Sequence, residues 1–345
     1  MSLRRLSACT FTFAALAFVS PAWGEGAASG ASAPHRDVRS WLVRIHEAAG
    51  RQNFQGTFVV SSPGHVASAR MAHFCEGSNQ YERIESLDGQ KRNVYRYNDT
   101  VHTLWPANGV AVVEQRALTS SFPALLQSGN DGVSDWYEVE RRGEDRVAGH
   151  VVDVLLVKPK DDYRYGYQLW SDKASGLLLR ADVLDPHGDV LETSAFSDIT
   201  IGVRPKPESV LQPMKQLDRY RVLRPILSQT QLEAEGWTMR EPAPGFRLVS
   251  CVSRQMDRGG AAASAGASAP AGDRRVLQAI FADGMTYVSV FIEPYRESRH
   301  ARPLATVSGA TQTLSVRHGD WWVTVVGDVP ASTLRFFATA LERRN

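Results

Sequence analysis

The fold of this chain is decided by residues 163–170, which read Tyr-Arg-Tyr-Gly-Tyr-Gln-Leu-Trp. Side chains in a β-strand alternate between two faces, so the three tyrosines share one face while Arg164 lies on the other. The segment therefore predicts a strand with a strongly aromatic face. Such a face either packs beneath helices of its own domain or lines a partly open concavity for an apolar ligand, and the residues alone leave both interpretations open.

Short runs rich in β-forming residues lie on both sides of this segment at even spacing. They comprise residues 54–60, 71–74, 81–87, 93–98, 101–105, 110–113, 137–140, 151–158, 177–184 and 190–201. The links at 88–89 and 185–188 are typical of tight turns. Only two helices are predicted here, at 37–50 and 118–127. Strands joined by short turns favour a meandering antiparallel sheet.

A second, smaller α+β unit is predicted beyond a proline-broken segment that starts at Arg204. Its strands are expected at residues 247–253, 275–281, 287–293, 311–317 and 321–326, and a closing helix is expected from Pro330 to Arg344. Residues 259–272 contain only Gly, Ala, Ser and Pro and predict a surface loop. We expect an α+β protein with domains at 37–203 and 223–345, joined by a linker at 204–222 that contains a connecting helix at 211–222.

Residues 1–24 have the pattern of a secretory signal. Arg4 and Arg5 precede a mostly apolar stretch, and small residues occupy the end of the segment. Residues 25–36 predict a flexible lead-in. Cleavage after Gly24 would remove two arginines and no acid from a chain of net charge +2, which leaves a neutral protein. Bulk charge therefore excludes a strongly basic nucleic-acid binder. We expect an exported protein.

Two cysteines, Cys75 and Cys251, remain after that cleavage. In an oxidising compartment they would either pair and join the two halves of the chain or persist as thiols, because sequence does not give the distance between them. The chain has no Cys-x-x-Cys motif, and its nine histidines form no His-Glu-x-x-His motif. We predict no catalytic residue, no metal and no cofactor, which favours a binding protein over an enzyme.

Several motifs follow one another along both halves of the chain. They are Phe54-x-Gly56-x-Phe58, the block at 163–172 that ends in Leu-Trp-x-Asp, the turn at 185–188, and residues 283–291 and 325–330. In this order they resemble the MucB/RseB family, the periplasmic negative regulators of a stress-response sigma factor. The low-complexity loop at 259–272 and Cys75 depart from the family pattern.

The resemblance implies a first domain like the lipoprotein carriers and receptors LolA and LolB, in which a curved antiparallel sheet forms a half-open barrel around helices and leaves an apolar cavity. Our candidates for lining such a cavity are Phe58, Tyr95, Tyr97, Trp105, Tyr163, Tyr165 and Tyr167. Our candidates for contacting anionic headgroups or an acidic partner are Arg164, Arg221 and Arg224. A core aromatic residue and a solvated arginine are the alternatives for each.

The resemblance also implies a partner and a compartment. A periplasmic regulator of this kind binds the periplasmic part of a transmembrane anti-sigma factor (RseA/MucA-type), shields it from regulated proteolysis, and is released by lipopolysaccharide or another lipid. The resemblance implies no nucleic-acid partner. The sequence leaves undecided whether the protein forms a homodimer. The alternative, motivated by the aromatic face, is a periplasmic lipid or lipoprotein carrier. The second domain counts against a pure carrier.

Overall fold

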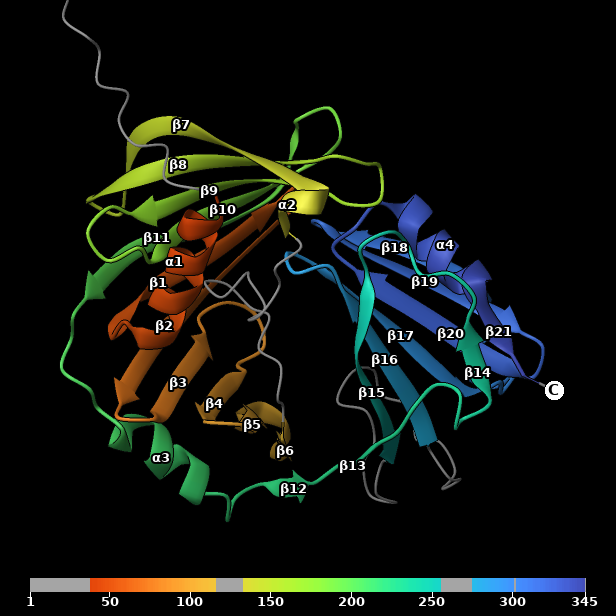
Figure 1. Cartoon of the computed structure of the whole chain (residues 1–345). Coiled ribbons are helices and arrows are strands. Elements are labelled where there is room, and N and C mark those ends of the chain that lie inside the picture. Colours follow the sequence, from red (N-terminus) through yellow and green to blue (C-terminus); the bar gives the residue numbers. More distant parts are fainter. Residues whose placement is uncertain (1–37, 116–132, 256–274, 301, 345) are drawn as a thin grey trace, which may run out of the picture. The chain divides into compact units, whose positions relative to one another are not determined.

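A computed structural model describes residues 38–115, 133–255, 275–300 and 302–344 (Figure 1). The expected secretory signal and lead-in, the helix at 118–127 and the loop at 259–272 lie outside these residues. Within them, no helix is long and apolar enough to cross a membrane. Two large sheets and one small sheet carry the described chain.

The first sheet has twelve strands, in the order β12-β6-β5-β4-β3-β2-β1-β11-β10-β9-β8-β7. In chain order the strands are β1 (Phe54–Ser62), β2 (His65–Glu76), β3 (Asn79–Ser86), β4 (Asn93–Tyr97), β5 (Thr100–Trp105), β6 (Val110–Gln115), β7 (Tyr137–Val147), β8 (His150–Pro159), β9 (Gly166–Asp172), β10 (Leu178–Leu184), β11 (Val190–Ile201) and β12 (Arg221–Leu223). A short 3₁₀ helix, η1 (Pro106–Asn108), precedes β6. The predicted antiparallel sheet is confirmed, and its one parallel pair is β12 with β6.

Both faces of this sheet are covered by a helix. Helix α1 (Val38–Arg51) packs Leu42 and Ile45 into a core that also contains the short helix α2 (Val133–Trp136). Helix α3 (Glu208–Lys215) contributes Val210 to a second core on the opposite face. Strand alternation sets the division, because Met71 of β2 joins the α1 core while its neighbour Ala72 joins the α3 core.

The second sheet has seven strands in the order β13-β15-β16-β17-β20-β19-β18. In chain order they are β13 (Ile226–Gln229), β15 (Arg247–Gln255), β16 (Arg275–Ala282), β17 (Tyr287–Pro294), β18 (Leu304–Ser308), β19 (Thr311–His318) and β20 (Trp321–Gly327). Helix α4 (Ala331–Ala340) buries Leu334 and Phe337 against it. Strands β14 (Trp237–Met239) and β21 (Leu341–Arg343) form the third sheet.

Three predicted elements differ from the observed ones. The strand expected from Tyr163 begins only at β9, since the Tyr163 N–H donates to the Asp161 carboxylate (3.0 Å) in a local turn. The connecting helix expected at 211–222 is instead α3, which starts directly after Pro207, followed by β12. The closing helix ends at Ala340, because fully buried Leu341 is extended and pairs with Met239.

The disulfide that the sequence left open between Cys75 and Cys251 is not formed, and both residues are free thiols. They lie in different surroundings. The Cys75 thiol donates to the Gly50 carbonyl at the end of α1 (2.9 Å), whereas Cys251 lies in the core of the second sheet. Burial raises the pKa of both thiols, that of Cys251 to about 11. Neither is a reactive thiolate at neutral pH.

These thiols give a direct test of the fold. In the chain from residue 25 onward, which contains only these two cysteines, a thiol reagent at pH 8 should react slowly with the folded protein, because both groups are protonated and Cys251 is buried. It should titrate two thiols after unfolding in denaturant without reductant. Recovery of no thiol under those conditions would contradict the structure.

Candidate functional site

The seven aromatic candidates do not line one cavity. Phe58 packs against the α1 core, and Tyr167 is buried within it. Trp105 is half-buried and faces the same side of the sheet, because its neighbour Leu104 belongs to the α3 core on the other side. Phe58, Trp105 and Tyr167 therefore share a sheet face, which is the side of α1.

Tyr95 and Tyr97 lie on the opposite face, in the α3 core. The Tyr95 hydroxyl donates to the Glu85 carboxylate (3.2 Å), and burial together with that negative charge raises the pKa of Tyr95 to about 12. Tyr97 stacks on Tyr81, with ring centroids 5.1 Å apart, and its hydroxyl donates to Asn79 (3.2 Å). Both are core tyrosines with satisfied hydroxyls.

Tyr163 and Tyr165 lie just before β9 and contact the second sheet and its helix. The Tyr163 ring meets Phe336 of α4 edge-on, at 5.6 Å between centroids, and its carbonyl accepts a hydrogen bond from Thr333 (2.9 Å). The Tyr165 hydroxyl accepts a hydrogen bond from Gln312 of β19 (3.4 Å). These tyrosines join the two sheets.

Between them lies Arg164, which is one of the most deeply buried side chains in the described chain. Its guanidinium donates to the Asp283 carboxylate (2.7 Å) and to Asp161 (2.9 Å), and also to the Pro244 carbonyl. The Arg164 and Asp283 side chains are both 0% exposed. Arg164 therefore does not face solvent, and its guanidinium already has three internal acceptors.

The surroundings of this ion pair complete a network that we call the Arg164 junction, formed by Arg164, Asp283, Asp161, Tyr137 and the Pro244 carbonyl. The Tyr137 hydroxyl donates to Asp283 (2.8 Å), and the other Asp283 oxygen accepts the N–H groups of residues 285 and 286. Burial raises the pKa of Asp283, although Arg164 and these donors oppose the shift. Burial also raises the pKa of Tyr137 well above its usual value, with the Asp283 charge adding to the effect.

Aromatic rings enclose the guanidinium of the junction. The centroids of Trp136, Tyr137 and Phe246 lie 5.0, 5.5 and 5.1 Å from it. Gly245 has a positive φ of +83°, and a Cβ there would lie 2.6 Å from the Trp136 ring, so this ring needs glycine beside it. The arrangement is a charge pair in an apolar shell, without a nucleophile or an open face.

Arg221 and Arg224 are exposed at and just after β12. The backbone N–H of Arg221 donates to the Gly109 carbonyl (2.7 Å), which holds this strand against the first sheet. After burial, the charge of Arg224 is the second cause that lowers the pKa of His102. Both guanidinium groups lie where an anionic ligand could reach them.

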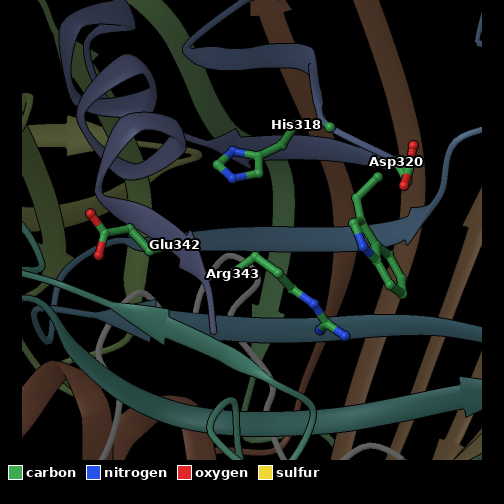
Figure 2. Close-up of a pocket in the computed structure, with 6 residues that line it drawn as sticks. His318, Asp320, Glu342 and Arg343 are labelled. Carbon is green, nitrogen blue, oxygen red and sulfur yellow. The ribbon is translucent and has the colours of Figure 1, made fainter. Parts of the chain in front are cut away.

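A shallow hollow of about 490 Å³ lies at one end of the second sheet (Figure 2). It is lined by His318, Gly319, Asp320, Trp321, Glu342 and Arg343. The Arg343 guanidinium lies 4.9 Å from the Trp321 ring centroid and donates to the Glu235 carbonyl (2.6 Å). These six residues include no nucleophile beside a base. Among the described residues, no cluster of His, Cys, Asp and Glu could hold a metal ion.

Sequence reasoning missed the second half of the junction. The sequence predicts Tyr137 only as the start of a strand, and it presents residues 283–291 only as one motif of the resemblance. The signal available was the resemblance itself, since residues 163–172 and 283–291 are both among its motifs. Nothing in the sequence indicated that these two blocks touch.

Comparison with known proteins extends over both sheets. The MucB/RseB N-terminal domain family matches residues 37–215, and the MucB/RseB C-terminal domain family matches residues 231–342. The sigma factor AlgU regulatory protein MucB of Pseudomonas aeruginosa is 30% identical over 88% of this chain and 90% of its own length. The sigma-E factor regulatory protein RseB of Haemophilus influenzae is 24% identical over 88% and 91%.

Solved structures agree with these matches. A crystal structure of MucB in complex with MucA(peri) has a TM-score of 0.63 at 26% identity, covering 90% of this chain and all of that one. The complex of Pseudomonas aeruginosa MucA and MucB has a TM-score of 0.64 at 26% identity, covering 89% and 98%. Fold and matches together define a mostly-β regulatory protein of a non-enzymatic class. The chain belongs to the MucB/RseB family of sigma-factor regulatory proteins.

The Arg164 junction should contribute strongly to stability. Replacing Asp283 by Asn keeps the shape of the side chain but leaves the buried Arg164 charge with only Asp161 opposite it. We expect Asp283→Asn to lower the free energy of unfolding by about 3–5 kcal/mol, measured by urea denaturation. Glu140→Gln, which breaks an exposed ion pair with Lys158, is the matched control and should leave the urea midpoint almost unchanged. Equal effects of the two substitutions would contradict a structural role for the junction.

Proposed function

We propose that this protein binds the periplasmic part of a MucA-type anti-sigma factor and shields it from the protease that begins regulated proteolysis. The observation that carries this proposal is the whole-length similarity to MucB, whose crystal structure in complex with MucA(peri) overlaps both sheets. The secretory pattern of residues 1–24 supports a periplasmic location. The exposed arginines Arg221 and Arg224 offer contacts to the anionic headgroups of a lipid signal.

Release by lipopolysaccharide or another lipid is the second part of the proposal. Such a signal requires that lipid favours a conformation in which the anti-sigma factor binds poorly, with a coupling free energy of about 1–3 kcal/mol. Half-buried Phe58 and Trp105 remain the aromatic candidates for an apolar site of the half-open barrel type, since they share the α1 side of the first sheet, whereas Tyr167 is a core residue of that side. Arg164 is no longer a candidate for headgroup contact, because its donors are engaged internally.

The proposed domains at 37–203 and 223–345 require a linker between them. Most of the expected linker at 204–222 packs on the first sheet, since Val210 is fully buried and Val222 packs in the same core. We therefore propose that the linker between the domains is shorter than the expected segment 204–222. It consists of Arg224 and Pro225, between β12 and β13. A short linker suits a conformational switch, because only a few backbone angles change when the domains move relative to each other.

The alternative of a lipid or lipoprotein carrier has weaker support from the structure than from the aromatic pattern of residues 163–170. Tyr95 and Tyr97 are core residues of the α3 side, and Tyr163 and Tyr165 contact the second sheet. A carrier also has to deliver its ligand. Transfer of labelled lipid from donor to acceptor vesicles by the purified protein would favour the carrier.

A protection assay tests the proposed function. The periplasmic fragment of a MucA-type anti-sigma factor from the same organism is incubated with its first protease, with and without the protein. We expect saturating protein to slow cleavage and lipopolysaccharide to restore it. The double variant Arg221→Glu/Arg224→Glu should still protect the fragment but should need more lipopolysaccharide for release, because its headgroup contacts are reversed in charge. Unchanged cleavage at saturating wild-type protein would refute the proposal.

A further inference from the structure

Strand β18 ends the second sheet and presents an unusually open edge. It pairs with β19 from Leu304 opposite Ser315 to Ser308 opposite Thr311, and no described strand lies on its other side. All five of its residues are exposed, including Leu304 at 56% and Val307 at 68%. One row of backbone donors and acceptors on β18 therefore remains available to another strand.

Two other sheet edges in the described part of the chain are less suited to such pairing. Strand β7, at the edge of the first sheet, carries seven charged residues and an irregular register between Arg141 and Gly143. Strand β13, at the far edge of the second sheet, has four residues, one fewer than β18. Strand β18 has the sequence Leu-Ala-Thr-Val-Ser, with no charge and a regular register, and Pro303 directly precedes it. An edge of this composition favours strand addition.

The register also gives the chemistry that an added strand needs. Val307 lies on the same face as Gln312 and Leu314, whereas Leu304 lies on the opposite face with Ser315. An added strand would therefore meet an exposed apolar side chain on each face, so apolar residues on both of its faces would fit.

Charge gives the added strand a direction. Exposed Arg302 lies two residues before Leu304, the first residue of β18, and exposed Arg317 lies at the same end of the β18–β19 ladder. The Arg317 guanidinium is held over the Tyr295 ring at 3.9 Å and donates to the Gly319 carbonyl (2.8 Å). Glu293 is close by but is already paired with Arg299. An acidic residue on the partner would be attracted to this end.

We propose that β18 is a docking edge for an extended segment of the anti-sigma factor, apolar on both faces and acidic at the end beside Arg302. This inference rests on the proposed function, because that function supplies the partner. Main-chain hydrogen bonds to β18 would provide affinity, and Leu304, Val307 and Arg302 would select the register and direction of the segment.

The test compares two substitutions at exposed valines. Val307→Lys places a charge on the docking edge, whereas Val66→Lys places the same charge at a similarly exposed valine (64%) on β2 of the first sheet. Binding of the MucA-type periplasmic fragment is measured by calorimetry, and folding of each variant by urea denaturation. We expect Val307→Lys to weaken binding at least about tenfold and Val66→Lys to leave it unchanged. Arg302→Glu, outside the strand, should slow association and reduce its salt dependence.

Amide hydrogen exchange provides the second readout, and we expect the fragment to slow exchange in β18 of the wild-type protein. Wild-type binding with no effect of Val307→Lys, or with no slowing in β18, would overturn the docking edge and leave the proposed function intact. No binding by the wild-type protein would overturn both. A wild-type dimer that Val307→Lys converts to a monomer while fragment binding persists would assign the edge to a second copy of the chain.

Discussion

The ion pair between Arg164 and Asp283 is the constraint on which the rest of the structure depends. A charged guanidinium out of contact with water is strongly unfavourable unless its charge and its donors are matched. Here one carboxylate comes from the turn between β16 and β17, 119 residues away in sequence, and the Pro244 carbonyl adds a third acceptor. The aromatic block that contains Arg164 therefore cannot adopt its observed conformation without the second sheet. Tyr163 and Tyr165 point to the same conclusion, since each contacts a residue of the second half of the chain.

The first sheet could be predicted well because its determinants are local. Alternating side chains and short turns specify antiparallel neighbours without knowledge of the rest of the chain, and the runs β1 to β6 and β7 to β11 follow them, whereas the pairing of β1 with β11 joins distant segments. The end of α4 could not be predicted, since Leu341 has a helical pattern behind it and becomes extended only because β14 pairs with β21. That pairing joins segments about 100 residues apart, and hydrophobic periodicity contains no such information.

The candidate site was harder to predict than the first sheet, because it depends on contacts between segments that are distant in the sequence. Sequence indicated that the tyrosines of the block share a face, which holds only if the strand begins at Tyr163. The turn at Asp161 delays the strand to Gly166, so Tyr163 and Tyr165 leave the sheet and only Tyr167 enters the α1 core. The sequence assigned Arg164 to contact with anionic headgroups or an acidic partner, or to solvent, and all of these roles require an exposed guanidinium. Only knowledge of Asp283 as a neighbour would have reversed that assignment. The family, in contrast, was recognisable, because it depends on the order of motifs and not on their contacts.

The parallel pairing of β12 with β6 links the two sheets through a very short tether. Three residues of β12 are held against the first sheet, and only Arg224 and Pro225 separate β12 from β13 of the second sheet. An extended residue spans about 3.3 Å, so release of the three residues of β12 would lengthen the unpaired connection between the sheets by about 10 Å. Release of this three-pair ladder would lengthen the covalent connection, but it would also remove Val222 from the α3 core, and the Arg164 junction would still hold the two sheets together.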